Sequence, residues 1–283
     1  MIPFNAILFF GLFNFISCSH HGNISNLSLK EEIKSPLQET ITQLTFYGTA
    51  YIKIKGDPAF SPIVFISLHS DETTGQQVVS NYVKQNNSAF IQIVNNKHRL
   101  ISFTSLKRKY VFDPNRIFSK KGIRLTLELY SSYSPKAAIQ VKKFADLILK
   151  QLSFAKTIIA VHNNSFGKYS ILGYLKGGKD CKNALRVNEI NGSDPDDFFL
   201  TTSTQLFERL KAKNFNIVLQ ENEHVFNDGS LSYYYRNINT QYINIEAQQG
   251  HFLKQAEMLR VLVSVLQGDD VHTLRRNYTY NWW

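Results

Sequence analysis

The stretch that decides the fold is residues 63–75, IVFISLHSDETTG. It opens with an apolar run rich in β-branched and aromatic residues, which is typical of a buried central strand. The run ends abruptly in His69, and Asp71, Glu72 and a Thr-Thr-Gly turn follow. Such an ending is either a polar loop or half of a metal site, and the rest of the sequence distinguishes the two.

Strands and helices alternate on both sides of this stretch. Short apolar runs predict a hairpin or two edge strands over 43–56 and further strands at 62–69, 88–95, 98–106, 156–162, 216–220 and 241–247. Amphipathic spacing predicts helices at 73–86, 134–152, 198–215 and 251–267. The alternation indicates an α/β fold with a mixed or mostly parallel sheet, in which ligands bind at the carboxyl ends of strands.

The first residues of the chain indicate export. Residues 1–17 carry no charged side chain and are mostly apolar, which predicts a signal peptide. Cys18 and the three residues before it resemble a bacterial lipoprotein cleavage box, and plain secretion or an uncleaved anchor are the alternatives to a lipidated Cys18. The polar segment 18–38 predicts a tether. We therefore expect an exported protein, periplasmic or anchored to the bacterial envelope.

Composition bounds the remainder of the chain. We expect one folded domain over 39–270, which contains all the motifs considered below, and a basic, aromatic tail over 271–283. The hydrophobic share of 43% suffices for a large core, and Cys181 is the only cysteine besides Cys18. If Cys18 is lipidated, no intramolecular disulfide can form, and the core must supply the stability. The net charge of +10 would suit several acidic partners, but no nucleic-acid motif is present. We expect no nucleic-acid partner, and membrane contact only through Cys18.

Two histidines and a glutamate form a candidate metal site. His69 and Glu72 have the spacing His-x-x-Glu at a turn from a strand into a helix. His162 ends a separate apolar strand, KTIIAVH. Two histidines and one glutamate are a known ligand set of catalytic zinc, which keeps a fourth position open. We expect one Zn²⁺ per chain on these three residues, although such a site can hold other divalent metals.

An acid and two arginines complete the candidate chemistry. Glu246 ends the strand QYINIEA, where burial would raise its pKa and fit it to act as a general base and acid. Arg116 follows Asn115 directly, and Arg108 lies eight residues before Arg116. A guanidinium binds a carboxylate through a planar fork, which suggests a substrate with a free carboxylate. Arg116 could alternatively polarise the scissile carbonyl.

The order of these motifs resembles a known superfamily. The segments HSDETTG, DPNRIF, AVHNN and NIEAQQG, taken together, are similar to the zinc metallocarboxypeptidases, and most similar to the aspartoacylase and succinylglutamate desuccinylase branch. The resemblance covers roughly residues 60–265. It implies a three-layer sandwich with a mixed, mostly parallel central sheet, and it implies substrate-binding roles for Arg108, Asn115 and Arg116.

The chain departs from the family pattern at three places. Pro114 replaces an aliphatic residue in the Asn-Arg motif, and Asp71 could compete with Glu72 as the carboxylate ligand. The assignment of Arg108 is positional only.

The segment 229–237, GSLSYYYRN, is interpreted as a packed strand in preference to a mobile lid.

Three functions are therefore compared. The first is an exported zinc hydrolase that cleaves a peptide or amide bond adjacent to a free carboxylate, on a peptide, a cell-wall peptide or an N-acyl amino acid. The second is an envelope lipoprotein that binds a ligand on a retained hydrolase fold without turnover. The third is a structural envelope protein without stoichiometric zinc. The presence of residues for every role in the site favours the first.

Overall fold

The computed structural model describes residues 39–43, 50–86 and 88–268, with 39–43 described as backbone only. The predicted signal peptide, the tether with Cys18 and the C-terminal tail all lie outside these residues. Among the described residues, no helix combines the length and the apolar character needed to cross a membrane.

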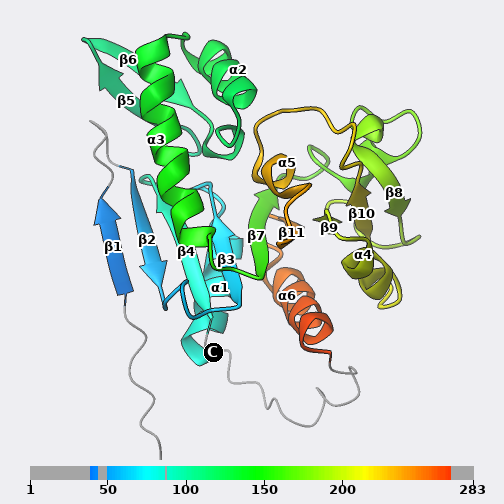
Figure 1. The fold of residues 1–283 in the computed structure, drawn as a ribbon. Coiled ribbons are helices and arrows are strands. Elements are labelled where there is room, and N and C mark those ends of the chain that lie inside the picture. The colour runs from blue at the N-terminus through cyan, green and yellow to red at the C-terminus, as the bar shows by residue number, and fades with distance from the viewer. Residues whose placement is uncertain (1–38, 44–49, 87, 269–283) are drawn as a thin grey trace, which may run out of the picture. The chain divides into compact units, whose positions relative to one another are not determined.

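A nine-stranded sheet forms the centre of the structure, in the order β1-β2-β4-β3-β7-β11-β9-β10-β8 (Figure 1). Its strands are β1 Glu39–Gln43, β2 Tyr51–Lys55, β3 Ile63–Ser67, β4 Ala89–Val94, β7 Thr157–Asn164, β8 Ala184–Asn188, β9 Phe198–Thr201, β10 Ile217–Gln220 and β11 Gln241–Gln248. Strands β4, β3, β7 and β11 are mutually parallel, and antiparallel pairs occur on both sides of this centre. The predicted α/β class with a mixed sheet is confirmed.

Helices cover both faces of this sheet. They are α1 Thr73–Gln85, α2 Lys120–Tyr130, α3 Pro135–Leu152, α4 Thr204–Lys211, α5 Leu231–Tyr235 and α6 Phe252–Gln267. One apolar core joins one face to α2, α3, α5 and a separate hairpin, β5 Ile101–Ser105 with β6 Arg108–Phe112. A second core joins the other face to α1, α4 and α6. Because both faces are buried, the central strands are continuous apolar runs.

Strand β3 shows how this arrangement follows from the sequence. Val64 and Ile66 belong to the core under α3, whereas Phe65 between them belongs to the core under α1 and α6. Side chains alternate across a strand, so one apolar run supplies both cores. Helix α3 begins at Pro135, after Ser134 accepts a hydrogen bond from the Ala137 amide at 3.1 Å.

Part of one predicted helix is a strand. The helix expected over 198–215 begins only at Thr204, after Ser203 accepts a hydrogen bond from the Leu206 amide. The preceding residues form β9, which pairs with β10 and β11 and is buried throughout. A run of four residues is too short for its periodicity to separate strand from helix, and here the sheet pairing decides.

The tyrosine-rich segment 229–237 also differs from expectation. It contains the short helix α5 in place of a strand, and Ser230 caps the helix by accepting from the Tyr233 amide at 3.2 Å. Tyr235 is buried and stacks on Tyr242 of β11, with ring centroids 5.9 Å apart. The aromatic residues therefore fix α5 against the sheet, and strand propensity is overridden by this packing.

Two glycines allow close contact between the start of α2 and the segment before α5. A Cβ on Gly122 would lie 2.3 Å from the Gly229 Cα and 2.6 Å from the Arg116 carbonyl oxygen. Gly229 itself has φ +78°, a conformation that glycine adopts at little cost. This contact holds the backbone of Arg116 against the segment that leads into α5.

Gly122→Ala is expected to lower the free energy of unfolding by at least ~2 kcal/mol. Helix propensity alone would predict the opposite, since alanine favours a helix over glycine by about 1 kcal/mol. The sign of the change, measured by chemical denaturation, therefore reports the close contact. Lys120→Ala, at an exposed position of the same helix, is the control and should change stability little; a stabilised Gly122→Ala variant would contradict this packing.

Candidate active site

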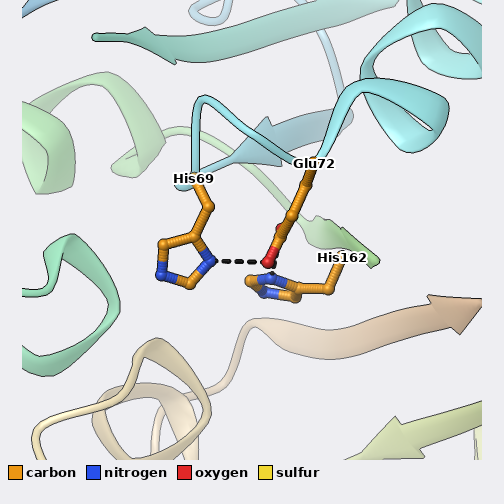
Figure 2. Close-up of side chains that lie close together, drawn as sticks. All are labelled: His69, Glu72 and His162. Carbon is orange, nitrogen blue, oxygen red and sulfur yellow. Dashed lines mark hydrogen bonds and ion pairs between the residues drawn. The ribbon is translucent and has the colours of Figure 1, made fainter. Parts of the chain in front are cut away.

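His69, Glu72 and His162 converge in the structure (Figure 2). The His69 Nδ1 lies 2.8 Å from Glu72 Oε1, and the His162 Nδ1 lies 2.9 Å from Glu72 Oε2. One potential ligand atom from each residue lies within 4.8 Å of the other two, and all three side chains are buried. The sequence spans 93 positions between the first and last of them (162 − 69), but the fold places them around one point.

The sheet brings these residues together. His69 follows β3, Glu72 directly precedes α1, and His162 belongs to β7, which pairs with β3. The last residue of the opening motif, Gly75, donates its amide to Asn163 Oδ1 at 2.9 Å. A Cβ on Gly75 would lie 2.9 Å from the Gln255 amide nitrogen, which donates to the His162 carbonyl oxygen. Glycine at this position therefore lets α1 pack closely beside His162.

Asp113 orients His69 from the other side of the ring. The His69 Nε2 lies 2.8 Å from Asp113 Oδ1. Burial acts against the charged imidazole, but Glu72 and Asp113 outweigh it and raise the pKa of His69 to about 9. Burial also acts against the ionised Glu72 carboxylate, but the two histidines outweigh it and hold the pKa of Glu72 well below its ordinary value.

This donor set fits a zinc ion. Two imidazole nitrogens and a carboxylate oxygen are the ligand types of a catalytic zinc site with an open position. A carboxylate on the distal nitrogen of a ligand histidine, as Asp113 is on His69, fixes the tautomer that leaves Nδ1 available. The His162 Nε2 is buried and has no hydrogen-bond partner among the described residues, so its Nδ1 is the nitrogen engaged in the site.

Glu72 is the carboxylate that faces both imidazoles, and Asp71 is not part of the group. The Asp71 side chain lines the same cavity, but its Oδ1 is buried without a partner among the described residues. Figure 2 shows the Glu72 carboxylate pointing at His69 and His162. Because Glu72 lies at the start of α1, its side chain projects back toward the end of β3.

Glu246 lies beside His162. The two residues are direct partners in the pairing of β11 with β7, so their side chains share one face of the sheet. Burial raises the pKa of Glu246 to about 7, with a further contribution from Glu72, while His162 acts in the opposite direction. A carboxyl group with a pKa near neutrality can both accept and donate a proton.

These residues line a cavity of about 580 Å³, which also contains Asn115 and Arg116. Asp113 Oδ1 accepts from the Asn115 amide at 2.8 Å, and Asn115 Oδ1 accepts from the Leu231 amide at 3.2 Å. Arg116 lies 3.5 Å from Asp228. The Asn-Arg motif thus connects the metal-type cluster to α5, and it brings a guanidinium into the cavity.

Arg108 does not join the site, which corrects its predicted placement. It is the first residue of β6, paired with Ser105 at the turn of the hairpin, and it is exposed. Asp113 lies five residues further along the chain, so roughly 16 Å of extended strand separates Arg108 from the site at ~3.3 Å per residue. Arg108 instead lies over the ring of Tyr110 at 6.0 Å.

Arg99 is a residue of the site that the sequence interpretation did not include. It lines the cavity and donates to Glu72 Oε1 at 2.8 Å. It lies in the turn between β4 and β5, and β4 is the direct parallel neighbour of β3. Its place in the chain could have indicated its role, since loops that follow neighbouring parallel strands meet at one edge of the sheet. Arg99 had been included in a predicted strand.

Comparison with known proteins gives low similarity throughout. No family model and no curated protein sequence matches the chain. Among solved structures, the succinylglutamate desuccinylase from Chromobacterium violaceum aligns with a TM-score of 0.45 and 12% identity, covering 82% of this chain and 73% of that one. Bovine thrombin-activatable fibrinolysis inhibitor, in complex with a tick carboxypeptidase inhibitor, aligns at 0.43 and 13%, covering 85% and 91%.

A third structure is the tripeptide-bound cell shape determinant Csd4 from Helicobacter pylori, with a TM-score of 0.44 and 10% identity over 83% of this chain and 57% of that one. The chemistry of the site has to be taken from its own residues.

Asp113→Asn is expected to weaken zinc affinity about 10- to 100-fold at neutral pH, because the orienting carboxylate of His69 is lost while the side-chain shape is kept. Competition with a chromophoric chelator measures the dissociation constant. Asp146→Asn, on the exposed face of α3 where Asp146 pairs with Lys142, is the matched control. An unchanged affinity in Asp113→Asn would exclude this orienting role.

Glu246→Gln is expected to stabilise the metal-free protein at pH 8 by ~3 kcal/mol and to have little effect near pH 4.5. From its ordinary value of 4.5 up to about 7, the unfolded chain releases the Glu246 proton while the folded chain retains it. The wild type therefore loses stability as the pH rises through this window. Urea denaturation in the presence of a chelator measures the difference, and a difference independent of pH would contradict the raised pKa.

Proposed function

We propose that this protein is a zinc-dependent hydrolase that cleaves a peptide or amide bond next to a free carboxylate. The observation that carries the proposal is one cavity in which the cluster of His69, Glu72 and His162 lies beside Glu246, a buried acid whose pKa is raised to about 7. A metal-type donor set, a proton-transfer group and guanidinium groups are the parts that amide hydrolysis requires.

His69, Glu72 and His162 would hold the ion, and Asp113 would orient the His69 ring. When bound, zinc supplies Lewis acidity and favours ionisation of water at neutral pH. The chain's part is to keep both Nδ1 atoms and the Glu72 carboxylate aimed at one point. Two hydrogen bonds support this geometry. Asp113 Oδ1 bonds to the His69 Nε2, and the Gln255 side-chain amide donates to the His162 carbonyl oxygen.

Glu246 is assigned the proton transfers. As a carboxylate it accepts a proton from the attacking water, and as a carboxylic acid it then donates that proton to the leaving nitrogen. The proton gained in the first step is the proton lost in the second, so the residue returns to its initial state. Its raised pKa suits both steps near neutral pH.

The guanidinium groups of Arg116 and Arg99 are assigned to oxygen atoms of the substrate. Arg116 is held by Asp228 and by its own hydrogen bond to the Asn115 carbonyl oxygen at 2.7 Å, which orients it in the cavity. A free carboxylate on the substrate is the natural partner of such a fork. Arg99, next to Glu72, suits the oxygen of the scissile carbonyl.

Two substrate classes fit this chemistry, peptides and N-acyl amino acids. The predicted leader over 1–17 favours peptides, including cell-wall peptides, because these substrates occur outside the cytoplasm. We propose accordingly that the protein is exported and acts in the periplasm or on the envelope, with a lipid anchor at Cys18 as its membrane contact.

Glu246→Gln in the full chain is expected to retain about one zinc per chain and to lower kcat on acyl-amino acids and peptides with free carboxyl termini at least about 100-fold. His69→Ala, in contrast, should lose both zinc and activity. Metal content by plasma emission spectroscopy, measured beside amine release, separates the two effects.

The wild type and an exposed-site variant, Lys142→Ala, serve as controls. A wild-type protein that binds zinc but cleaves no such substrate would instead support a binding lipoprotein on a retained hydrolase fold. A folded wild type that takes up no divalent metal would exclude the hydrolase.

A further inference from the structure

The wall of the cavity beyond Glu246 is polar. Asn244 lies two residues before Glu246 on β11, and the two side chains therefore project from the same face of the sheet. Gln220, the last residue of β10, and Ser232 of α5 also line the cavity. Strands β9 and β10 contribute Leu200 and Gln220 to this wall, and neither residue is charged.

Two buried amides on this wall have unused hydrogen-bonding capacity. Asn244 is 7% exposed, and one end of its amide is engaged by the Tyr242 hydroxyl at 2.5 Å. Gln220 is 3% exposed, and its nitrogen donates to Asn222 Oδ1 at 3.2 Å and to the Ser232 carbonyl at 3.4 Å. The Asn244 Nδ2 and the Gln220 Oε1 have no partner among the described residues.

These amides are continuous with the proposed carboxylate site. Asn115, next to Arg116, accepts from the Leu231 amide, and Ser232 follows in the same helix and contacts Gln220. Arg116 lines the same cavity as the two amides, so a substrate whose carboxylate is held by Arg116 has space to direct its adjacent side chain toward them. The groups that await it are one amide donor and one amide acceptor, both neutral.

We propose that this wall is a specificity pocket for an uncharged polar side chain, such as that of glutamine, asparagine or serine, on the residue that carries the free carboxylate. An apolar side chain would displace water from the two amides without replacing its hydrogen bonds. A charged side chain would meet no opposite charge on β9 or β10. The inference rests on the proposed function for the identity of the substrate, and on Asn244 and Gln220 for its selectivity.

The experiment uses the zinc-loaded full chain and N-acetyl-Ala-X peptides together with N-acetyl-X, where X is Gln, Asn, Ser, Leu, Phe, Lys or Glu. The kcat/KM for the uncharged polar group should exceed that for Leu and Phe at least about tenfold, because each unpaired buried amide disfavours the apolar substrate. Equal or better cleavage of Leu, Phe, Lys or Glu substrates would overturn the pocket while leaving the hydrolase in place.

Binding decides the pocket independently of turnover. Isothermal titration of zinc-loaded Glu246→Gln with the free amino acids should give tighter binding for Gln and Asn than for Leu and Phe, also by about tenfold. If Gln and Asn bind more tightly than Leu and Phe but the wild type cleaves none of the substrates, the pocket is supported and the proposed hydrolase activity is excluded. The reverse order would remove the pocket.

Two variants test the individual amides. Asn244→Leu and Gln220→Leu should each shift the ratio of kcat/KM for Gln over Leu substrates at least about tenfold toward Leu. Gln205→Leu, the same kind of change at an exposed position of α4, should leave the ratio unchanged. Circular dichroism and zinc content establish folding, and either variant suffices if the other does not fold. An unchanged ratio in both folded variants would overturn the assignment.

Discussion

The parallel alignment of β3, β7 and β11 is the constraint on which the site depends. These strands are neighbours in the sheet and run in one direction, so the residues at their carboxyl ends meet at the same edge. His69 follows the first strand, and His162 and Glu246 are paired near the ends of the other two. Backbone hydrogen bonds of the sheet fix the relative positions of His162 and Glu246, and His69 lies two residues after the end of β3.

Burial gives these residues their chemistry. The residues that meet at this edge of the sheet are also buried away from water. The protonation state of each ionisable group therefore depends on the charges and hydrogen bonds of its neighbours. Glu72 has imidazoles on both sides, and its carboxylate is held ionised. Burial is the largest influence on Glu246 and raises its pKa to about 7, although His162 acts in the opposite direction. Two glutamates in one cavity thereby suit the different tasks proposed for them, Glu72 to bind a metal and Glu246 to transfer protons.

The other half of the cavity comes from less regular parts of the chain. The contact between Gly122 and Gly229 holds the backbone of Arg116 beside the segment that leads into α5. Tyr235 and Tyr242 fix α5 on the sheet through their stacked rings. The metal-type residues therefore lie on or just after central strands, whereas Arg116 and α5 belong to short helical segments packed over the edge of the sheet.

Local patterns were sufficient for much of this structure. The run at 63–75 identified a buried strand, the turn and the following helix, because strand and helix periodicities are properties of neighbouring residues. Motif spacing likewise nominated His69, Glu72, His162 and Glu246, since each ends an apolar strand or follows one. The same reasoning assigned 198–215 entirely to a helix, because a run of only four residues does not reveal whether a strand will pair with it.

What the sequence determined by itself was the α/β alternation and the residue types available for metal and proton chemistry. Only the tertiary structure decided which residues meet. Arg99 lines the cavity, Arg108 lies at a hairpin turn, and Asn244 and Gln220 line the cavity from two different strands, because distance in space is set by strand order and helix packing. Local sequence patterns do not specify the order of the strands, which is set by how the strands and helices pack into the core.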